Sequence, residues 1–199
     1  MDYPVNLTID YPDRLSRLTT AFRVILIVPI VIILALVSGS GWGNAWRAPL
    51  VVGGTVFVPT VLMLLFRQKY PRWWFDWNAN LAKFGLRFGA YAALLRDTYP
   101  STDEEQAVHA QIDYPQVTQL KTGLPLVKWF LAIPHYIVLG FLAVAMVVVI
   151  VIAWFAILFT GRYPRSLFDF VVGVMRWGLR VGAYAFLLVT DVYPPFSLR

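Results

Sequence analysis

The stretch GLRFGAY occupies residues 85–91, and the closely similar stretch GLRVGAY occupies residues 178–184. Each places an arginine between two glycines inside an otherwise apolar run. Around these motifs, residues 66–95 and 159–188 align without gaps, and 15 of the 30 pairs are identical. Similarity of this extent at a fixed spacing indicates an internal duplication. We therefore predict a tandem repeat, with a first unit at residues 1–107 and a second at residues 108–199.

The duplication extends toward the start of each unit. VNLTIDYP (5–12) and VHAQIDYP (108–115) alternate apolar and polar residues, which predicts two short strands that pair with each other. VILIVPIVIILAL (24–36) corresponds to WFLAIPHYIVLGF (129–141), with Pro29 opposite Pro134. The register of the two units differs by twelve residues on either side of residues 38–49, so we interpret that segment as an insertion in the first unit.

The composition predicts an integral membrane protein. The chain is 59% hydrophobic and 14% charged, whereas soluble domains average roughly 45–50% and about 25%. Residues 24–46, 48–66 and 129–161 lack charge, and a span needs about 20 residues. We predict four spans, at about 22–39, 48–66, 124–143 and 144–161, so that each unit contains a transmembrane hairpin. A single long helix over residues 129–161, about 50 Å in length, is the open alternative for the second hairpin.

A helix follows each predicted hairpin, at about 73–95 and about 166–188, and both are amphipathic. On a helical wheel one narrow polar sector contains Asp76, Asn80, Lys83, Arg87 and Tyr91 in the first helix, and Asp169, Gly173, Arg176, Arg180 and Tyr184 in the second. This pattern is typical of a helix that lies in the membrane interface. If both helices lie flat, 16 of the 17 Lys and Arg residues lie on one side or in these helices, and only Arg47 lies opposite. By the positive-inside rule both termini are then cytoplasmic.

The candidate functional residues belong to these two helices. We predict that anionic lipid headgroups or a partner protein bind six cations: Arg72, Lys83, Arg87, Arg165, Arg176 and Arg180. Gly85, Gly89, Gly178 and Gly182 form two G-x-x-x-G motifs, which are typical of close helix packing in lipid.

Asp76, Asp169 and His135 are candidates for an ion or proton site, because ionisable groups at membrane depth are costly and often functional. The alternative is that the two aspartates lie on a wetted helix face and that His135 lies near the interface. No cysteine is present, and we find no metal-ligand cluster and no phosphate-binding or dinucleotide-binding glycine motif. We therefore predict neither catalysis, nor a metal or other cofactor, nor nucleic-acid binding.

LVKWFLAIPHYIVLGFL (126–142) and the stretch from IAWFAIL to DVYPPF (152–196) resemble bacterial membrane proteins of domain-of-unknown-function family 4389. The first unit is similar to a diverged copy, in which Ile30 replaces His135. The resemblance implies a multi-pass protein of the bacterial inner membrane and implies no particular activity.

The sequence thus favours a non-catalytic accessory or scaffold subunit, whose partners are membrane lipids and either another membrane protein or further copies of itself. The alternative function is a small transporter or channel with its pathway between the two units.

Overall fold

The protein is mostly helical, and its described residues contain one two-stranded sheet. The computed structural model describes residues 3–37, 54–102, 104, 106–117, 120–121 and 123–199. In chain order, the elements are β1 (Val5–Ile9), α1 (Arg17–Ala21), α2 (Arg23–Val37), α3 (Gly54–Arg67), α4 (Arg72–Ala92), β2 (Val108–Ile112), the 3-10 turn η3 (Leu124–Leu126), α5 (Lys128–Leu131), α6 (Ile133–Thr160), α7 (Arg165–Gly182) and the π-helix η4 (Ala183–Leu187).

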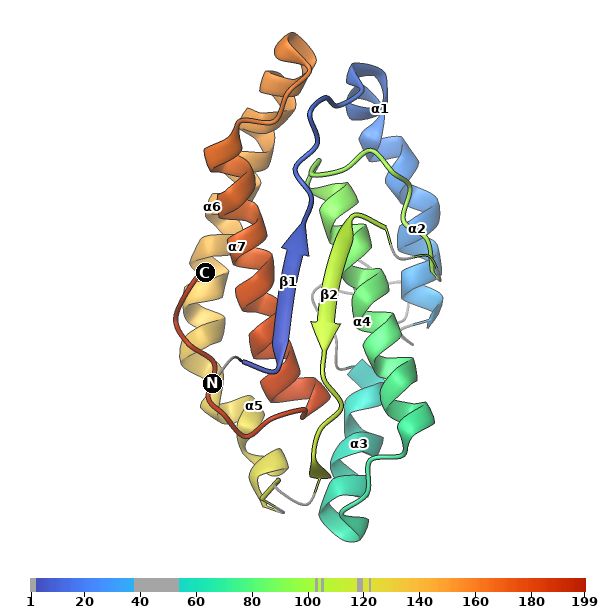
Figure 1. Ribbon diagram of the computed structural model, residues 1–199, viewed down its shortest axis with the longest axis vertical. Helices are drawn as coiled ribbons and strands as arrows, with labels where there is room; N and C mark the ends of the chain where they lie inside the picture. Colours follow the sequence, from blue (N-terminus) through green and yellow to red (C-terminus); the bar gives the residue numbers. More distant parts are fainter. Residues whose placement is uncertain (1–2, 38–53, 103, 105, 118–119, 122) are drawn as a thin grey trace.

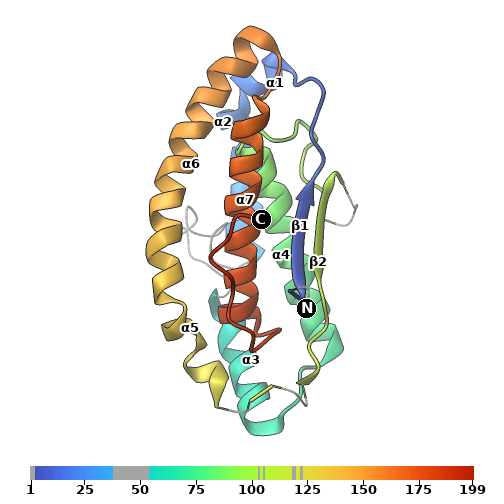
Figure 2. The same ribbon diagram turned by 60° about the vertical axis from the view of Figure 1, so that its left-hand side comes forward.

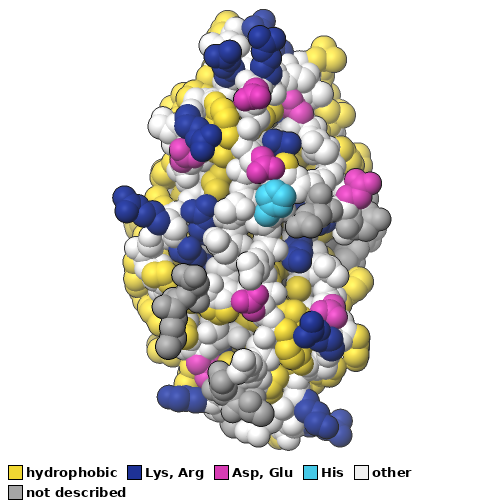
Figure 3. All heavy atoms as spheres, viewed as in Figure 1, with side chains coloured by type: hydrophobic (Ala, Val, Ile, Leu, Met, Phe, Trp, Pro, Cys, Tyr) yellow, Lys and Arg dark blue, Asp and Glu magenta, His cyan; other side chains and the backbone are white. Residues whose placement is uncertain are grey.

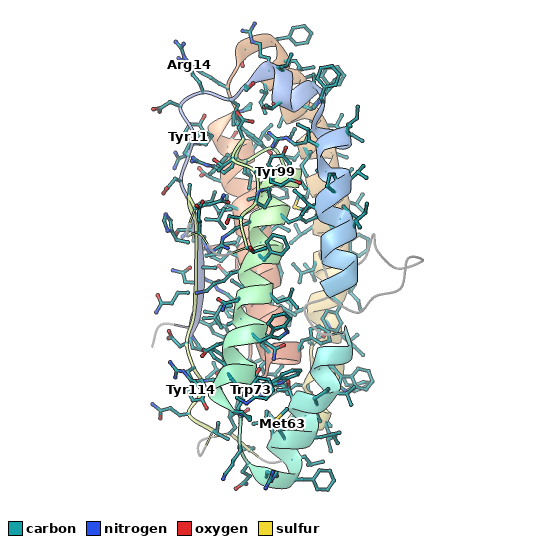
Figure 4. All side chains as sticks on the ribbon, turned by 90° about the vertical axis from the view of Figure 1, so that its right-hand side faces the viewer. Tyr11, Arg14, Met63, Trp73, Tyr99 and Tyr114 are labelled. Atoms are coloured by element: carbon teal, nitrogen blue, oxygen red, sulfur yellow. The ribbon has the colours of Figure 1, made fainter. Side chains whose placement is uncertain are left out.

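The elements form three layers that run along one long axis (Figure 1). The sheet is the first layer, α4 and α7 lie beneath it, and α2, α3 and α6 form the third layer on the far side (Figures 2 and 4). We call α2, α3 and α6 the outer layer. Within the middle layer, α7 contacts β1 on one side and α6 on the other, whereas α4 contacts β2 and α2.

The predicted strands are confirmed, and they pair antiparallel with Leu7 opposite Ala110. Val5, Leu7 and Ile9 are buried, and Asn6 and Thr8 between them are exposed. A two-stranded sheet is only marginally stable alone in water. The buried side chains of β1 instead join the main hydrophobic core through α7.

The predicted hairpin at 124–143 and 144–161 is wrong, because α6 continues without a break from Ile133 to Thr160. Its 28 residues make a helix about 42 Å long. Gly140 is the one residue near the expected turn that favours a break, and a lone glycine is tolerated inside a helix. The helix ends where Gly161 adopts a left-handed conformation at φ 73°. The single long helix, the alternative left open by the sequence, is therefore the observed structure.

Among the described residues, two helices are long and apolar enough to cross a membrane, over residues Ile133–Thr160 and Arg165–Leu187, so the four predicted spans are not supported. The predicted spans at 22–39 and 48–66 contain α2 and α3, for which the structure describes 15 and 14 helical residues. The expected insertion at 38–49 lies outside the described residues.

The two amphipathic helices are confirmed as α4 and α7, and each begins directly after a Tyr-Pro pair. They end alike, at left-handed residues Leu94 and Leu188. The second ending contains one residue more. Leu95 N–H donates to the Ala90 carbonyl, whereas Val189 N–H reaches the Ala183 carbonyl, one residue further back. The π-helix η4 contains the additional residue.

Candidate functional site

Seven of the nine exposed cations among the described residues lie in two groups at the ends of the long axis. One end carries Arg14, Arg17, Arg162 and Arg165, where α1 meets the turn between α6 and α7. The other end carries Arg67, Lys69 and Arg72, at the turn between α3 and α4. We call these groups the first and second cationic ends. Figure 4 places Tyr11 and Arg14 at one end and Trp73 and Tyr114 at the other.

Each cationic end contains an arginine, an aspartate and a tyrosine in the same arrangement. Arg165 lies 4.6 Å from the centre of the Tyr11 ring and 3.2 Å from Asp169. Arg72 lies 4.5 Å from the Tyr114 ring and 3.7 Å from Asp76. All four charged side chains are more than half exposed. The predicted ion-site aspartates therefore lie in surface ion pairs at opposite ends of the molecule, which is the wetted-face alternative.

The tyrosines of these groups connect the sheet to the helices through hydrogen bonds. The Tyr11 hydroxyl donates to the carbonyl of Tyr163, immediately before α7, and the Tyr114 hydroxyl donates to the carbonyl of Tyr70, immediately before α4. Each strand is thus tied to a helix from the other half of the chain. These two hydrogen bonds connect the first and second halves of the chain at both ends of the molecule.

Two arginines in the polar sectors of α4 and α7 make hydrogen bonds within the molecule. Arg176 Nε donates to the Leu7 carbonyl at 2.7 Å, and its Nη1 donates to the Leu198 carbonyl at 3.2 Å. Arg87 is buried and donates to the Ser101 carbonyl at 2.9 Å. The expectation that this sector faces lipid or water is wrong for Arg87, which is buried. Arg176 is half-buried and contacts the sheet and the C-terminal tail.

Lys83 and Arg180 are half-buried. The backbone carbonyl of Arg180 accepts a hydrogen bond from the Tyr3 hydroxyl at 3.3 Å. Of the six predicted cations, Arg72 and Arg165 are thus the two that are well exposed to a ligand.

Two buried ion pairs were not predicted. Lys128 lies 2.6 Å from Asp191, and Arg23 lies 2.6 Å from Asp97. Each cation also sits over a tyrosine ring, Lys128 at 5.3 Å from Tyr184 and Arg23 at 3.9 Å from Tyr91. The second oxygen of each aspartate accepts a backbone N–H, from Lys121 and Ser16 respectively.

Burial lowers the pKa of Lys128, and the adjacent Asp191 opposes that shift. The sequence does contain a signal for these pairs, because each aspartate begins a D-x-Y-P motif (97–100 and 191–194) and each cation precedes a helix proline by six residues.

His135 is fully buried among aromatic rings. Its Nδ1 accepts a hydrogen bond from Trp177 Nε1 at 3.1 Å, and its ring stacks on Phe196 with centroids 4.0 Å apart. The Nε2 atom makes no hydrogen bond to any described residue. The structure thus places His135 in a packing role for the C-terminal tail, away from both Asp76 and Asp169. Among the described residues, no three His, Asp or Glu side chains are grouped as a metal site would require.

Of the four predicted packing glycines, Gly89 lies against the neighbouring helix. A methyl group there would lie 3.1 Å from Met175 of α7, whereas one at Gly85, Gly178 or Gly182 would have no atom within 4 Å. Among the described glycines, Gly173 leaves the least space for a side chain, because a methyl group there would lie 2.8 Å from the Leu198 carbonyl oxygen.

Gly173→Ala should therefore lower the free energy of unfolding by about 1–3 kcal/mol, because the added methyl must displace the C-terminal tail. Gly178→Ala, five residues along the same helix, is the matched control and should raise stability by up to about 1 kcal/mol through helix propensity. Thermal unfolding in detergent, followed by circular dichroism, measures both. Equal stability of the two variants would contradict the assigned contact.

Residues 125–197 match the family described as Domain of unknown function (DUF4389), which confirms the resemblance of the second half of the chain. The matched region contains α5, α6, α7 and the tail, and therefore both the Lys128–Asp191 pair and the His135 cluster. No curated protein and no solved structure matches the chain.

Proposed function

We propose that the protein is a non-catalytic accessory or scaffold subunit of the bacterial inner membrane, which binds anionic lipid headgroups and docks a partner protein. The observation that carries the proposal is the placement of seven exposed cations at the two ends of an apolar outer layer. Each cation near an anionic surface contributes about 1 kcal/mol of attraction. Seven of them therefore provide ample selectivity for acidic lipids.

The predicted cations differ in how accessible they are to a lipid headgroup. Arg72 and Arg165 are exposed beside their aspartates, and each has further cations around it at its end of the molecule. Arg87 and Arg176 already bind backbone carbonyls. We assign headgroup binding to the two cationic ends, and internal cross-linking to Arg87 and Arg176.

A tandem duplication explains why the two ends resemble each other. Contacts recur in corresponding places: the buried pairs Arg23–Asp97 and Lys128–Asp191, the exposed groups around Arg72 and Arg165, and the tyrosine hydroxyl bonds of Tyr11 and Tyr114. These matched contacts support two copies of one unit. The Arg72–Asp76 pair of the second cationic end belongs to the first copy, and the Arg165–Asp169 pair of the first cationic end belongs to the second copy.

The test replaces four cations, Arg67, Arg72, Arg162 and Arg165, with glutamine, and in a matched control with lysine. Lipid that purifies with the protein in mild detergent is quantified by mass spectrometry. We expect the ratio of anionic to zwitterionic lipid to fall at least about fivefold in the glutamine variant, the equivalent of one cation at about 1 kcal/mol. The lysine variant keeps the charge and should keep the ratio. An unchanged ratio in the glutamine variant would refute headgroup binding.

A further inference from the structure

We infer that the protein does not cross the bilayer but lies in one leaflet, with its long axis parallel to the membrane plane and the outer layer facing the acyl chains of anionic phospholipid. The inference rests on the proposed lipid binding and specifies its geometry. It follows from three features of the described residues: where apolar side chains are exposed, where polar side chains are exposed, and where the cations lie.

Apolar side chains are exposed along one whole face of the molecule. On α6 they extend from Ile137 to Phe159, and only 11% of the most apolar part of this helix is buried. The helices α2 and α3 continue this face with Val24, Ile25, Val28, Val58, Leu62 and Phe66. A protein that spans a membrane needs an apolar belt around its full circumference at bilayer depth. Here the exposed apolar surface follows a face and not a belt.

The opposite face is polar over the same length. Asn6 and Thr8 of β1 and His109 and Gln111 of β2 are exposed or partly exposed on the sheet, and charged side chains surround them (Figure 3). The sheet lies near the middle of the long axis (Figure 1). If that axis crossed the bilayer, these side chains and the two open strand edges would lie in hydrocarbon, where each unsatisfied polar group costs several kcal/mol.

The length of α6 agrees with the in-plane placement. At about 42 Å the helix is longer than the roughly 30 Å hydrocarbon core, and its exposed apolar residues continue to both of its ends. In the membrane plane no such length limit applies.

The positions of the two cationic ends also favour the in-plane placement. An upright molecule would place the first and second cationic ends on opposite membrane surfaces, without the bias toward one side that the positive-inside rule requires. In the plane both ends lie at one headgroup level. Packed helices lie about 8–10 Å apart, so α4 and α7 sit at that level above the outer layer. The exposed rings of Trp73, Trp77 and Trp129 suit the same boundary.

Because the chain contains no cysteine, single cysteines can test the placement directly. The variants are Ser166→Cys at the first cationic end, Lys69→Cys at the second, Gln111→Cys on the sheet and Val148→Cys on the outer layer. Each is treated with a membrane-impermeant maleimide in inside-out and in right-side-out membrane vesicles. We expect Ser166→Cys, Lys69→Cys and Gln111→Cys all to react in inside-out vesicles only. Val148→Cys should react only after detergent is added.

Labelling of the two ends from opposite sides would overturn the in-plane placement and favour a spanning molecule. Labelling of Val148→Cys without detergent would show that lipid does not cover the outer layer. A disulfide-linked dimer of Val148→Cys on oxidation would show that a second copy covers it, which also overturns the inference. The expected labelling pattern together with an unchanged ratio of anionic to zwitterionic lipid in the glutamine variant would refute the proposed headgroup binding alone.

Discussion

Replacing Lys128 with alanine is expected to lower the free energy of unfolding by about 3–5 kcal/mol, the cost typical of breaking a buried ion pair from one side. The Lys128 side chain is fully buried, lies 2.6 Å from Asp191 and donates to the Thr190 carbonyl at 2.7 Å. Without the ammonium group, a largely buried carboxylate and a carbonyl lose their cation. Denaturant unfolding in detergent micelles, followed by tryptophan fluorescence, measures the loss.

The exposed pair at the first cationic end provides the matched control. Asp169→Asn also removes one partner of an Arg/Lys–Asp pair, but both of its members are more than half exposed, so the cost should stay below about 1 kcal/mol. A second comparison combines Lys128→Met with Asp191→Asn. Since the two residues touch, the double variant should lose less stability than the sum of the single variants. Similar losses for Lys128→Ala and Asp169→Asn would contradict the assigned burial.

The amphipathic helices and the strands could be predicted because their signals are local. Period-two alternation marks β1 and β2, and Tyr-Pro pairs fix where α4 and α7 begin. Proline disfavours α geometry in the residue before it, so these boundaries have a local cause in the sequence.

The course of α6 was harder to predict, because nothing within its sequence signals either a turn or the absence of one. The prediction of a hairpin came from the length of the uncharged run and the thickness of a bilayer. That premise fails if the helix lies in the plane, where its length is unrestricted. The error therefore concerned the surroundings assumed for the helix, and not its propensity.

The surroundings of the arginines could not be predicted for a similar reason. A helical wheel shows which residues share a face, but not what covers that face. Arg176 meets the carbonyl of Leu7, which lies at the other end of the chain. The buried pairs also join distant residues, Arg23 to Asp97 and Lys128 to Asp191. A single sequence contains the D-x-Y-P motifs but does not say which cation each aspartate meets.

Leu7→Ala should lower the free energy of unfolding by about 2–5 kcal/mol, the range typical of large-to-small changes in a core. Leu7 is fully buried beneath β1, at the place where the strand packs on α7. Thr8→Ala, one residue along the same strand, changes an exposed side chain and should alter stability by no more than about 0.5 kcal/mol. The same fluorescence-detected unfolding measures both variants.

The contrast between these neighbours tests whether the sheet belongs to the core or is an independent flap. If β1 were a flap, Leu7→Ala would increase amide hydrogen exchange within the strand and leave global unfolding unchanged. The observed contacts argue otherwise. Arg176 binds the backbone of β1, and Tyr11 just beyond the strand binds the backbone before α7. Detachment of β1 would therefore release a charged side chain and uncover the apolar side of α7 together, so the strand and the helix should unfold as one unit.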